Sequence, residues 1–222
     1  MPLPLNRRIS RRDLQMSAIT LPAPLAFLVL HHRSAGLALA RETDPGAAGT
    51  PALAPTPACL DDDDLDETVA QTEGPFFTPD SPERTSLRED GITGTPLRVT
   101  GYVYSSGCDP VPGALLDFWH CDDNGVYDNE GYRLRGHQFA GDDGAFTLET
   151  IRPGLYTGRT RHIHVKVQAP GGPILTTQLY FPDEPENERD GIFDPSLVMD
   201  LEPPATETEE LTAFFTFIVD EA

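Results

Sequence analysis

The stretch RTRHIHVKVQAP, residues 159–170, places two histidines one residue apart in a segment that alternates like a β-strand. Alternate side chains of a strand point to the same face. We therefore expect His162 and His164 to lie side by side and to share one target. A same-face His-x-His pair is typical of a metal site, although surface histidines or a hydrogen-bonded core pair would give the same pattern.

The residues around the histidines discriminate between metals. Zinc would require a further His, Cys or carboxylate, and a ferrous oxygenase would require two His and one carboxylate. The unusual neighbours are tyrosines instead, Tyr127 and Tyr156. A phenolate is a hard anionic donor, so two of them would favour Fe(III) over Fe(II). Two tyrosines and two histidines would form a ferric site with one open position.

The elements that must position these residues are predicted to be strands. Short β-rich runs are separated by the turn signals Glu89-Asp90-Gly91, Asp142-Asp143-Gly144 and Pro170-Gly171-Gly172. No long segment shows helical periodicity. The sequence predicts an all-β fold, an antiparallel sandwich or barrel. The runs are PLRVTGYVYS, ALLDFWH, AFTLETI, HIHVKVQ, ILTTQLYF and LTAFFTFIVD.

Part of this pattern is shared with transthyretin-like β-sandwich modules, which often only bind or space. In such a module Tyr156 would pack in the core, and Phe118 and Trp119 are expected to be packing residues as well. The fold by itself does not supply a function.

The charge of the chain excludes two classes of partner. The 222 residues include 16 Lys and Arg against 36 Asp and Glu, a net charge of −20, and Lys166 is the only lysine. So acidic a chain should repel nucleic acid and anionic membranes.

Residues 1–40 are predicted to be an export signal. Four arginines precede the mostly apolar run 18–30, and Ala38-Leu39-Ala40 offers a cleavage site. The run is too short to span a bilayer, so no stable membrane insertion is expected after cleavage. The segment Ser10-Arg11-Arg12-Asp13-Leu14 resembles the twin-arginine export motif. The alternative interpretation is a disordered basic tail.

Residues 41–70 are interpreted as a Pro/Ala-rich and acidic linker, and residues 71–222 as the catalytic domain. In an exported protein two of the three cysteines could form a disulfide. Cys59 with Cys108 is the pairing we expect, which leaves Cys121 free; three isolated thiols are the alternative.

The stretch from TEGPFF to TTQLYFP, residues 72–182, resembles the intradiol ring-cleavage dioxygenases. The matching pieces occur in the family's order and span roughly half of the chain. They are Thr72–Phe77, Pro112–Ala114, Asp117–Trp119, Gly125–Tyr127, Arg135–Gly136, Thr150–Tyr156, Arg159, His162–His164 and Thr177–Phe181.

The resemblance implies a β-sandwich of the intradiol dioxygenase type with few short helices, a non-haem Fe(III) cofactor, and a small aromatic vicinal diol and O2 as substrates. The implied metal ligands are Tyr127, Tyr156, His162 and His164, with Tyr156 the ligand that leaves iron when the diol binds. Arg159 would be the cation beside the substrate ring, and Gln178 matches the family's pocket glutamine. The implied reaction cleaves a catechol between its two hydroxylated carbons to a cis,cis-muconic acid.

The sequence departs from the family in two places. The N-terminal helical region of the catechol branch, which serves dimerisation there, is replaced by the predicted signal and linker. The substrate and the oligomeric state therefore stay open, and a homo-oligomer is one of the alternatives. Arg161 stands where several relatives have a small residue, and it would either favour acidic or oversized substrates or point to solvent. No role is assigned to Arg133 or His137.

Two other functions are compatible with parts of the pattern. One is a non-catalytic β-sandwich binding or spacer module, and the other is a copper or zinc protein that uses the same site.

Overall fold

The computed structural model describes residues 65–202 and 210–220. The predicted signal, most of the predicted linker and Cys59 lie outside these ranges. Among the described residues no helix is long and apolar enough to cross a membrane. Cys121 is a buried free thiol, and Cys108 is disulfide-bonded, whereas its predicted partner Cys59 lies outside the described ranges.

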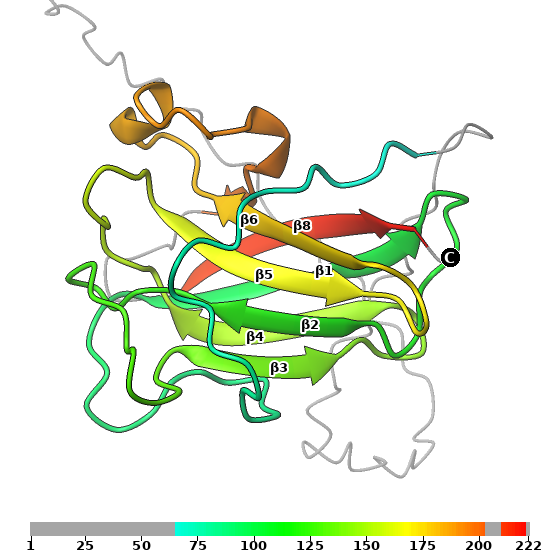
Figure 1. Cartoon of the computed structure of the whole chain (residues 1–222), viewed down its shortest axis with the longest axis horizontal. Coiled ribbons are helices and arrows are strands. Elements are labelled where there is room, and N and C mark those ends of the chain that lie inside the picture. Colours follow the sequence, from blue (N-terminus) through cyan, green and yellow to red (C-terminus); the bar gives the residue numbers. More distant parts are fainter. Residues whose placement is uncertain (1–64, 203–209, 221–222) are drawn as a thin grey trace, which may run out of the picture. The chain divides into compact units, whose positions relative to one another are not determined.

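Two four-stranded sheets pack face to face, as predicted for a β-sandwich (Figure 1). One sheet has the order β4 (Ala145–Ile151), β1 (Pro96–Ser105), β8 (Leu211–Val219) and β7 (Asp200–Glu202). The other has the order β3 (Arg135–Phe139), β2 (Leu115–Trp119), β5 (His162–Gln168) and β6 (Ile174–Tyr180). Neighbouring strands are antiparallel except β1 and β8, which are parallel. The helices of the described ranges are two short 3₁₀ turns, η1 (Pro185–Glu188) and η2 (Pro195–Leu197).

The six predicted strands are present, and β3 and β7 were missed. The sequence of β3, RGHQF, has no apolar stripe because its inward side is formed by Gly136 and Gln138. A Cβ at Gly136 would lie 2.8 Å from side-chain atoms of both Arg84 and Leu87. The strand therefore needs a glycine where the segment before β1 packs against it, and this long-range contact leaves no β-signal in the local sequence.

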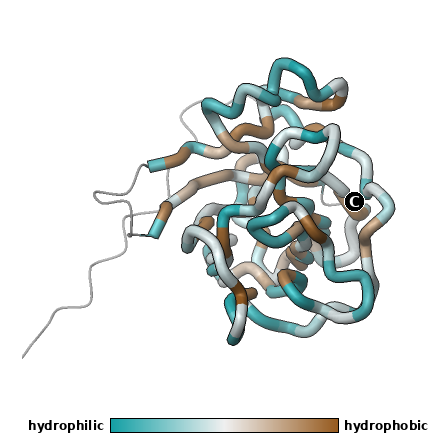
Figure 2. Tube along the Cα trace, turned by 90° about the vertical axis from the view of Figure 1, so that its left-hand side faces the viewer, coloured by the Kyte–Doolittle hydropathy of each residue, from teal (hydrophilic) through white to brown (hydrophobic). Residues whose placement is uncertain are grey.

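The core lies between the two sheets and follows from period-two alternation. On β5, the inward side chains of Ile163, Val165 and Val167 are fully buried, while the histidines belong to the outer face. Figure 2 shows apolar residues along the strands and hydrophilic residues around the outer loops. The strand pattern thus fixes which side of β5 is free to carry a site.

The segment before β1 covers the outer face of the β3-β2-β5-β6 sheet. It is tied to one edge, β6, by Gln71 N–H donating to Thr176 O at 2.8 Å, and to the other edge, β3, by Arg84 N–H donating to His137 O at 2.8 Å. The residues in between must cross the sheet over β5 and β2 (Figure 1). His162 and His164, on the outer face of β5, are buried as a result.

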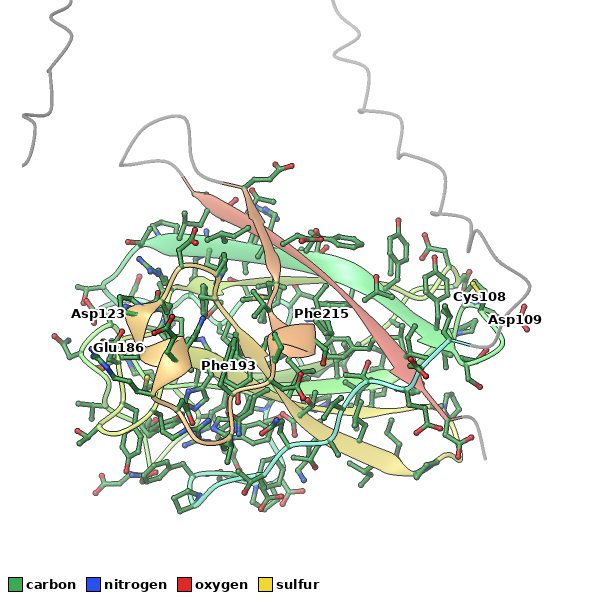
Figure 3. All side chains as sticks on the ribbon, turned by 90° about the horizontal axis from the view of Figure 1, so that it is seen from above. Cys108, Asp109, Asp123, Glu186, Phe193 and Phe215 are labelled. Carbon is green, nitrogen blue, oxygen red and sulfur yellow. The ribbon has the colours of Figure 1, made fainter. Side chains whose placement is uncertain are left out.

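Loops from distant parts of the chain gather at one end of the sandwich. Figure 3 shows Asp123, from the β2–β3 connection, and Glu186, from η1, at the end opposite Cys108 and Asp109. His162 begins β5 at the end where the β4–β5 connection arrives. This end of the sheet holds the candidate site.

Candidate metal centre

Three donor atoms from two elements converge over the outer face of β5. Nε2 of His162 lies 3.1 Å from Nε2 of His164 and 3.3 Å from the hydroxyl oxygen of Tyr127. His162 and His164 are each 3 % exposed, and Tyr127 is 7 % exposed. The two histidines therefore lie side by side, as their spacing predicted, and Tyr127 lies next to them; that they share a metal stays a prediction.

His162 is held in one tautomer. Its Nδ1 lies 2.6 Å from the carbonyl oxygen of Thr160, which can only accept, so Nδ1 carries the proton and Nε2 presents a lone pair. Burial lowers the pKa of His162 to about 4. The ring is thus a neutral donor at physiological pH, as a metal ligand must be.

His164 is fixed by packing. Its ring stacks on Trp119 with 4.8 Å between centroids and 4° between planes. Gly74, at φ +70°, approaches the same imidazole: a Cβ there would lie 3.5 Å from Cε1 of His164. Burial, and then the neighbouring His162, Arg159 and other cations, lower the pKa of His164 well below its usual value. This ring is also a neutral donor.

Tyr127 comes from the β2–β3 connection, which is docked on the β4–β5 connection. Gly154 N–H donates to Asp122 O at 2.7 Å, and a Cβ at Gly125 would lie 2.2 Å from Leu155 O. This close backbone approach, possible for glycine, brings the two tyrosine-bearing loops together. Burial raises the pKa of the Tyr127 phenol, while Arg159 and Arg135 oppose that rise.

Tyr156 lies beside this group. Its ring is edge-on to Tyr127 at 5.7 Å and to Phe76 at 5.4 Å between centroids. Phe76 in turn stacks on Tyr127 at 4.4 Å. Tyr156 is half-buried, and its hydroxyl makes no hydrogen bond within residues 65–202 and 210–220. Its position as a second phenol next to the three donors is clear, and its role as a ligand stays a prediction.

The donor set fits a ferric ion. The lone pair of His162 Nε2 can accept one hydrogen bond, yet two polar atoms approach it at 3.1 and 3.3 Å. Ligand atoms about 2.1 Å from one ion and about 100° apart would lie about 3.2 Å from each other. Neutral imidazoles with a phenol are donors that suit Fe(III) once the phenol has lost its proton.

Arg159 and Gln178 adjoin the donors, as the resemblance implied. Nη2 of Arg159 donates to Oε1 of Gln178 at 2.7 Å, and Gln178 is the cross-strand partner of His164. Nε2 of Gln178 donates to the carbonyl oxygen of Thr72 at 2.9 Å. Arg159 and Tyr156 also line an open cavity of about 300 Å³, large enough for a single aromatic ring.

Two residues that contact the site were not identified from the sequence. Arg135 on β3 is 1 % exposed, and its guanidinium donates to the carbonyl oxygens of Asp128 and Phe76. Asp190 accepts from Arg159 and from the backbone of Thr160. Arg135 was quoted only as part of a motif, and Asp190 stands in an acidic loop with no local signal.

The structure contradicts the prediction that Arg161 points to solvent. Its Nε lies 2.8 Å from Oε1 of Glu184, and Nη1 donates to the carbonyl oxygen of Pro153. The side chain is 16 % exposed. It does not point freely to solvent, because the buried carboxylate of Glu184 pairs with it; an effect of Arg161 on acidic or oversized substrates stays a prediction.

Arg133 and His137 have structural contacts. Arg133 donates to the carbonyl oxygen of Gly91, and His137 Nδ1 lies 3.1 Å from the hydroxyl of Ser81, which donates to Asp117 at 2.8 Å. Arg133 and Tyr127 also line an open cavity of about 400 Å³.

Comparison with known families decides the relationship. Residues 72–215 match the family model described as Dioxygenase. The chain belongs to the intradiol ring-cleavage dioxygenase family. The match begins at the covering segment and ends in β8, so it includes the whole donor set.

Individual relatives of this dioxygenase domain agree. Hydroxyquinol 1,2-dioxygenase of Nocardioides simplex is 32% identical over 152 residues, covering 58% of this chain and 52% of that protein. Chlorocatechol 1,2-dioxygenase of Rhodococcus opacus is 30% identical over 154 residues, covering 55% and 60%. The chain thus spans about half the length of the curated relatives it matches.

Solved structures give the same relationship. The dioxygenase domain of a dioxygenase carbohydrate-binding protein fusion from the cellulolytic bacterium Streptomyces sp. SirexAA-E is 55% identical, with a TM-score of 0.67; 71% of this chain and 100% of that chain are covered. The 3-chlorocatechol 1,2-dioxygenase of Rhodococcus opacus 1CP is 26% identical, with a TM-score of 0.66, covering 71% and 74%.

Proposed function

We propose that the protein is a non-haem Fe(III) intradiol dioxygenase that cleaves catechol-type aromatics with O2 between the two hydroxylated carbons, giving muconate-type diacids. The observation that carries the proposal is the convergence of the Tyr127 hydroxyl and the His164 Nε2 within 3.3 Å of His162 Nε2 on a buried sheet face. A spacer module has no need of such a donor set.

Tyr127, Tyr156, His162 and His164 would hold the iron. Ferric iron, when bound, would be chelated by both oxygens of a vicinal diol and would make the ring reactive toward O2. As a phenolate, Tyr156 could take a proton at its Oη from an incoming diol and become a neutral phenol.

The surrounding residues exclude water and supply charge. Phe76 and Trp119 cover Tyr127 and His164 with aromatic faces. Arg159 places a fixed positive charge beside the donors, where it stabilises negative charge on a substrate ring. Gln178 holds that guanidinium from the neighbouring strand at 2.7 Å.

The visible spectrum of the iron-loaded protein tests the proposal. We expect a phenolate-to-Fe(III) charge-transfer band that shifts when a catechol is added without oxygen. Subsequent admission of O2 should bleach the complex and release a muconate-type product. A protein that stays colourless with added ferric iron would exclude the dioxygenase and favour the non-catalytic binding module. Stoichiometric copper or zinc in the purified protein would favour a copper or zinc protein that uses the same site.

We also propose that residues 1–40 direct export by the twin-arginine route, because the arginines, the apolar run and the cleavage site follow one another in the order of a signal peptide. Replacing Arg11 and Arg12 by lysine should abolish export of the expressed chain in a bacterial host with this pathway. Cell fractionation measures the result. Unchanged export would contradict the twin-arginine route, and retention of the wild type in the cytoplasm would contradict export itself.

A further inference from the structure

The carboxylate of Asp190 lies outside every motif of the site, yet it reaches two of its parts. We propose that Asp190 is a positioning residue that fixes both the Arg159 guanidinium and the His162 imidazole in their working orientations. The inference rests on the proposed function, since it assigns Asp190 a task in that same site.

The contacts of Asp190 leave it no freedom. Its Oδ2 accepts from Nε of Arg159 at 2.8 Å and from the backbone N–H of Thr160 at 2.9 Å. Its Oδ1 accepts from the backbone N–H of Ile192 at 3.2 Å. The side chain is 2 % exposed. A buried carboxylate with three donors is held in one rotamer and is not available to substrate.

For Arg159, the consequence is a fixed plane. A guanidinium is rigid and planar, so holding Nε on Asp190 and Nη2 on Gln178 determines where its remaining N–H groups lie. Nη1 makes no hydrogen bond to any described residue. Asp190 thus leaves one end of the guanidinium for a substrate oxygen, at the edge of the cavity that Arg159, Tyr156 and Asp190 line.

For His162, the consequence is transmitted through Thr160. Asp190 holds the N–H of Thr160, Asn187 accepts from the Thr160 hydroxyl at 2.6 Å, and the Thr160 carbonyl accepts from Nδ1 of His162 at 2.6 Å. The loop residue that sets the tautomer of His162 is therefore anchored from the segment that follows β6. Loosening that anchor should weaken the grip of His162 on a metal.

A purely structural role for Asp190 is the competing explanation, and Glu184 provides the matched control. Glu184 lies on the same segment, its side chain is 6 % exposed, and it pairs with Arg161 and Arg152. It contacts neither Arg159 nor Thr160. Removing its charge costs a buried ion pair without touching the site.

The test compares Asp190→Asn and Glu184→Gln in the full, iron-loaded chain. We expect Asp190→Asn to lower kcat/KM for catechol about 10–100-fold, to weaken anaerobic catechol binding, read from the charge-transfer band, about tenfold, and to release Fe(III) to a chelator faster. Glu184→Gln should stay within about threefold of the wild type on all three readouts, even if its melting temperature falls as far as that of Asp190→Asn.

A double-mutant cycle separates the path through Arg159. In an Arg159→Met background, Asp190→Asn should cause a much smaller further loss of catechol affinity, because the guanidinium that Asp190 positions is absent and only the path through His162 remains. Asp190→Ser, which removes the carboxylate without added bulk, takes the place of Asp190→Asn if that variant does not fold.

Three results would overturn the proposal. The first is a kcat/KM and catechol affinity of Asp190→Asn within threefold of the wild type, and the second is an equal loss of both in Glu184→Gln. The third is a full additivity of the losses in catechol affinity of Arg159→Met and Asp190→Asn. A wild-type chain that binds no ferric iron would instead overturn the proposed function, and this inference with it.

Discussion

At the scale of single residues, the chemistry depends on protonation and orientation more than on residue type. His162 is a defined donor because its Nδ1–H donates a hydrogen bond to the Thr160 carbonyl and burial lowers its pKa to about 4. Tyr127 is the opposite case, since burial raises its pKa and only a cation would turn it into a phenolate. A bound cation would therefore be needed before Tyr127 could serve as a phenolate donor.

Changing Tyr127 to Phe should abolish iron retention and the visible band while the sandwich remains folded. The ring keeps its stacking on Phe76, at 4.4 Å, and loses only the donor oxygen. His164→Phe should do the same. Metal analysis and far-UV circular dichroism measure the two properties.

Tyr132→Phe is the control for these variants, because the Tyr132 hydroxyl donates to the Pro79 carbonyl on the surface, outside the donor group. It should keep its iron. Full activity in Tyr127→Phe would show that the ligand assignment is wrong.

At the scale of elements, the site is made of loops clamped onto one sheet. β5 supplies the two histidines, and the segment before β1 buries them. β3 supplies the clamp, since Arg135 donates to the Phe76 carbonyl in that segment and to the Asp128 carbonyl beside Tyr127. A buried guanidinium whose hydrogen-bond partners are backbone carbonyls acts as a rigid fork that joins the cover to the ligand loop.

Arg135→Met should lower the free energy of unfolding by about 3 kcal/mol, because the buried guanidinium is lost and two partly buried carbonyls lose their charged donor. Iron should also be lost to a chelator more readily. Urea denaturation and a chelator competition assay measure these effects. Arg98→Met is the control: its ion pairs with Glu149 and Glu210 are surface pairs, with the Arg98 side chain 37 % exposed, and about 1 kcal/mol is expected. Equal losses in both variants would contradict the clamp.

At the scale of the whole molecule, buried neutral histidines make stability depend on pH. Burial lowers the pKa of His120 and of His162 to about 4, and that of His164 in the same direction. In the unfolded chain each would titrate near 6.5. Between these values the unfolded state binds more protons than the folded state, so stability falls as the pH falls through the window.

For the iron-free protein, we expect the free energy of unfolding to fall by up to about 4 kcal/mol per pH unit between pH 6 and 5, the slope for three protons. Urea denaturation at several pH values measures it. His120→Gln should reduce the slope by about one third. A slope of less than one proton would show that these histidines are not buried as neutral groups.

Much of the architecture was predictable from the sequence, because strand alternation and turn residues are local signals. The six strands predicted from alternating runs are present, and the parity of residues 162 to 168 correctly placed both histidines on one shared face. β3 and β7 were not predictable in the same way. One buries a glycine against a distant segment, and the other has three residues.

The sequence by itself determined the candidate ligands, since a same-face His-x-His pair with two nearby tyrosines in the family's order is a local and ordered pattern. Tertiary structure alone decided what surrounds them. Asp190 reaches Thr160 across 30 positions of sequence, Arg135 reaches Phe76 across 59, and Arg161 finds its partner in Glu184. Such contacts depend on which loops meet at one end of the sheet, and residues that meet only after folding carry no shared spacing in the chain.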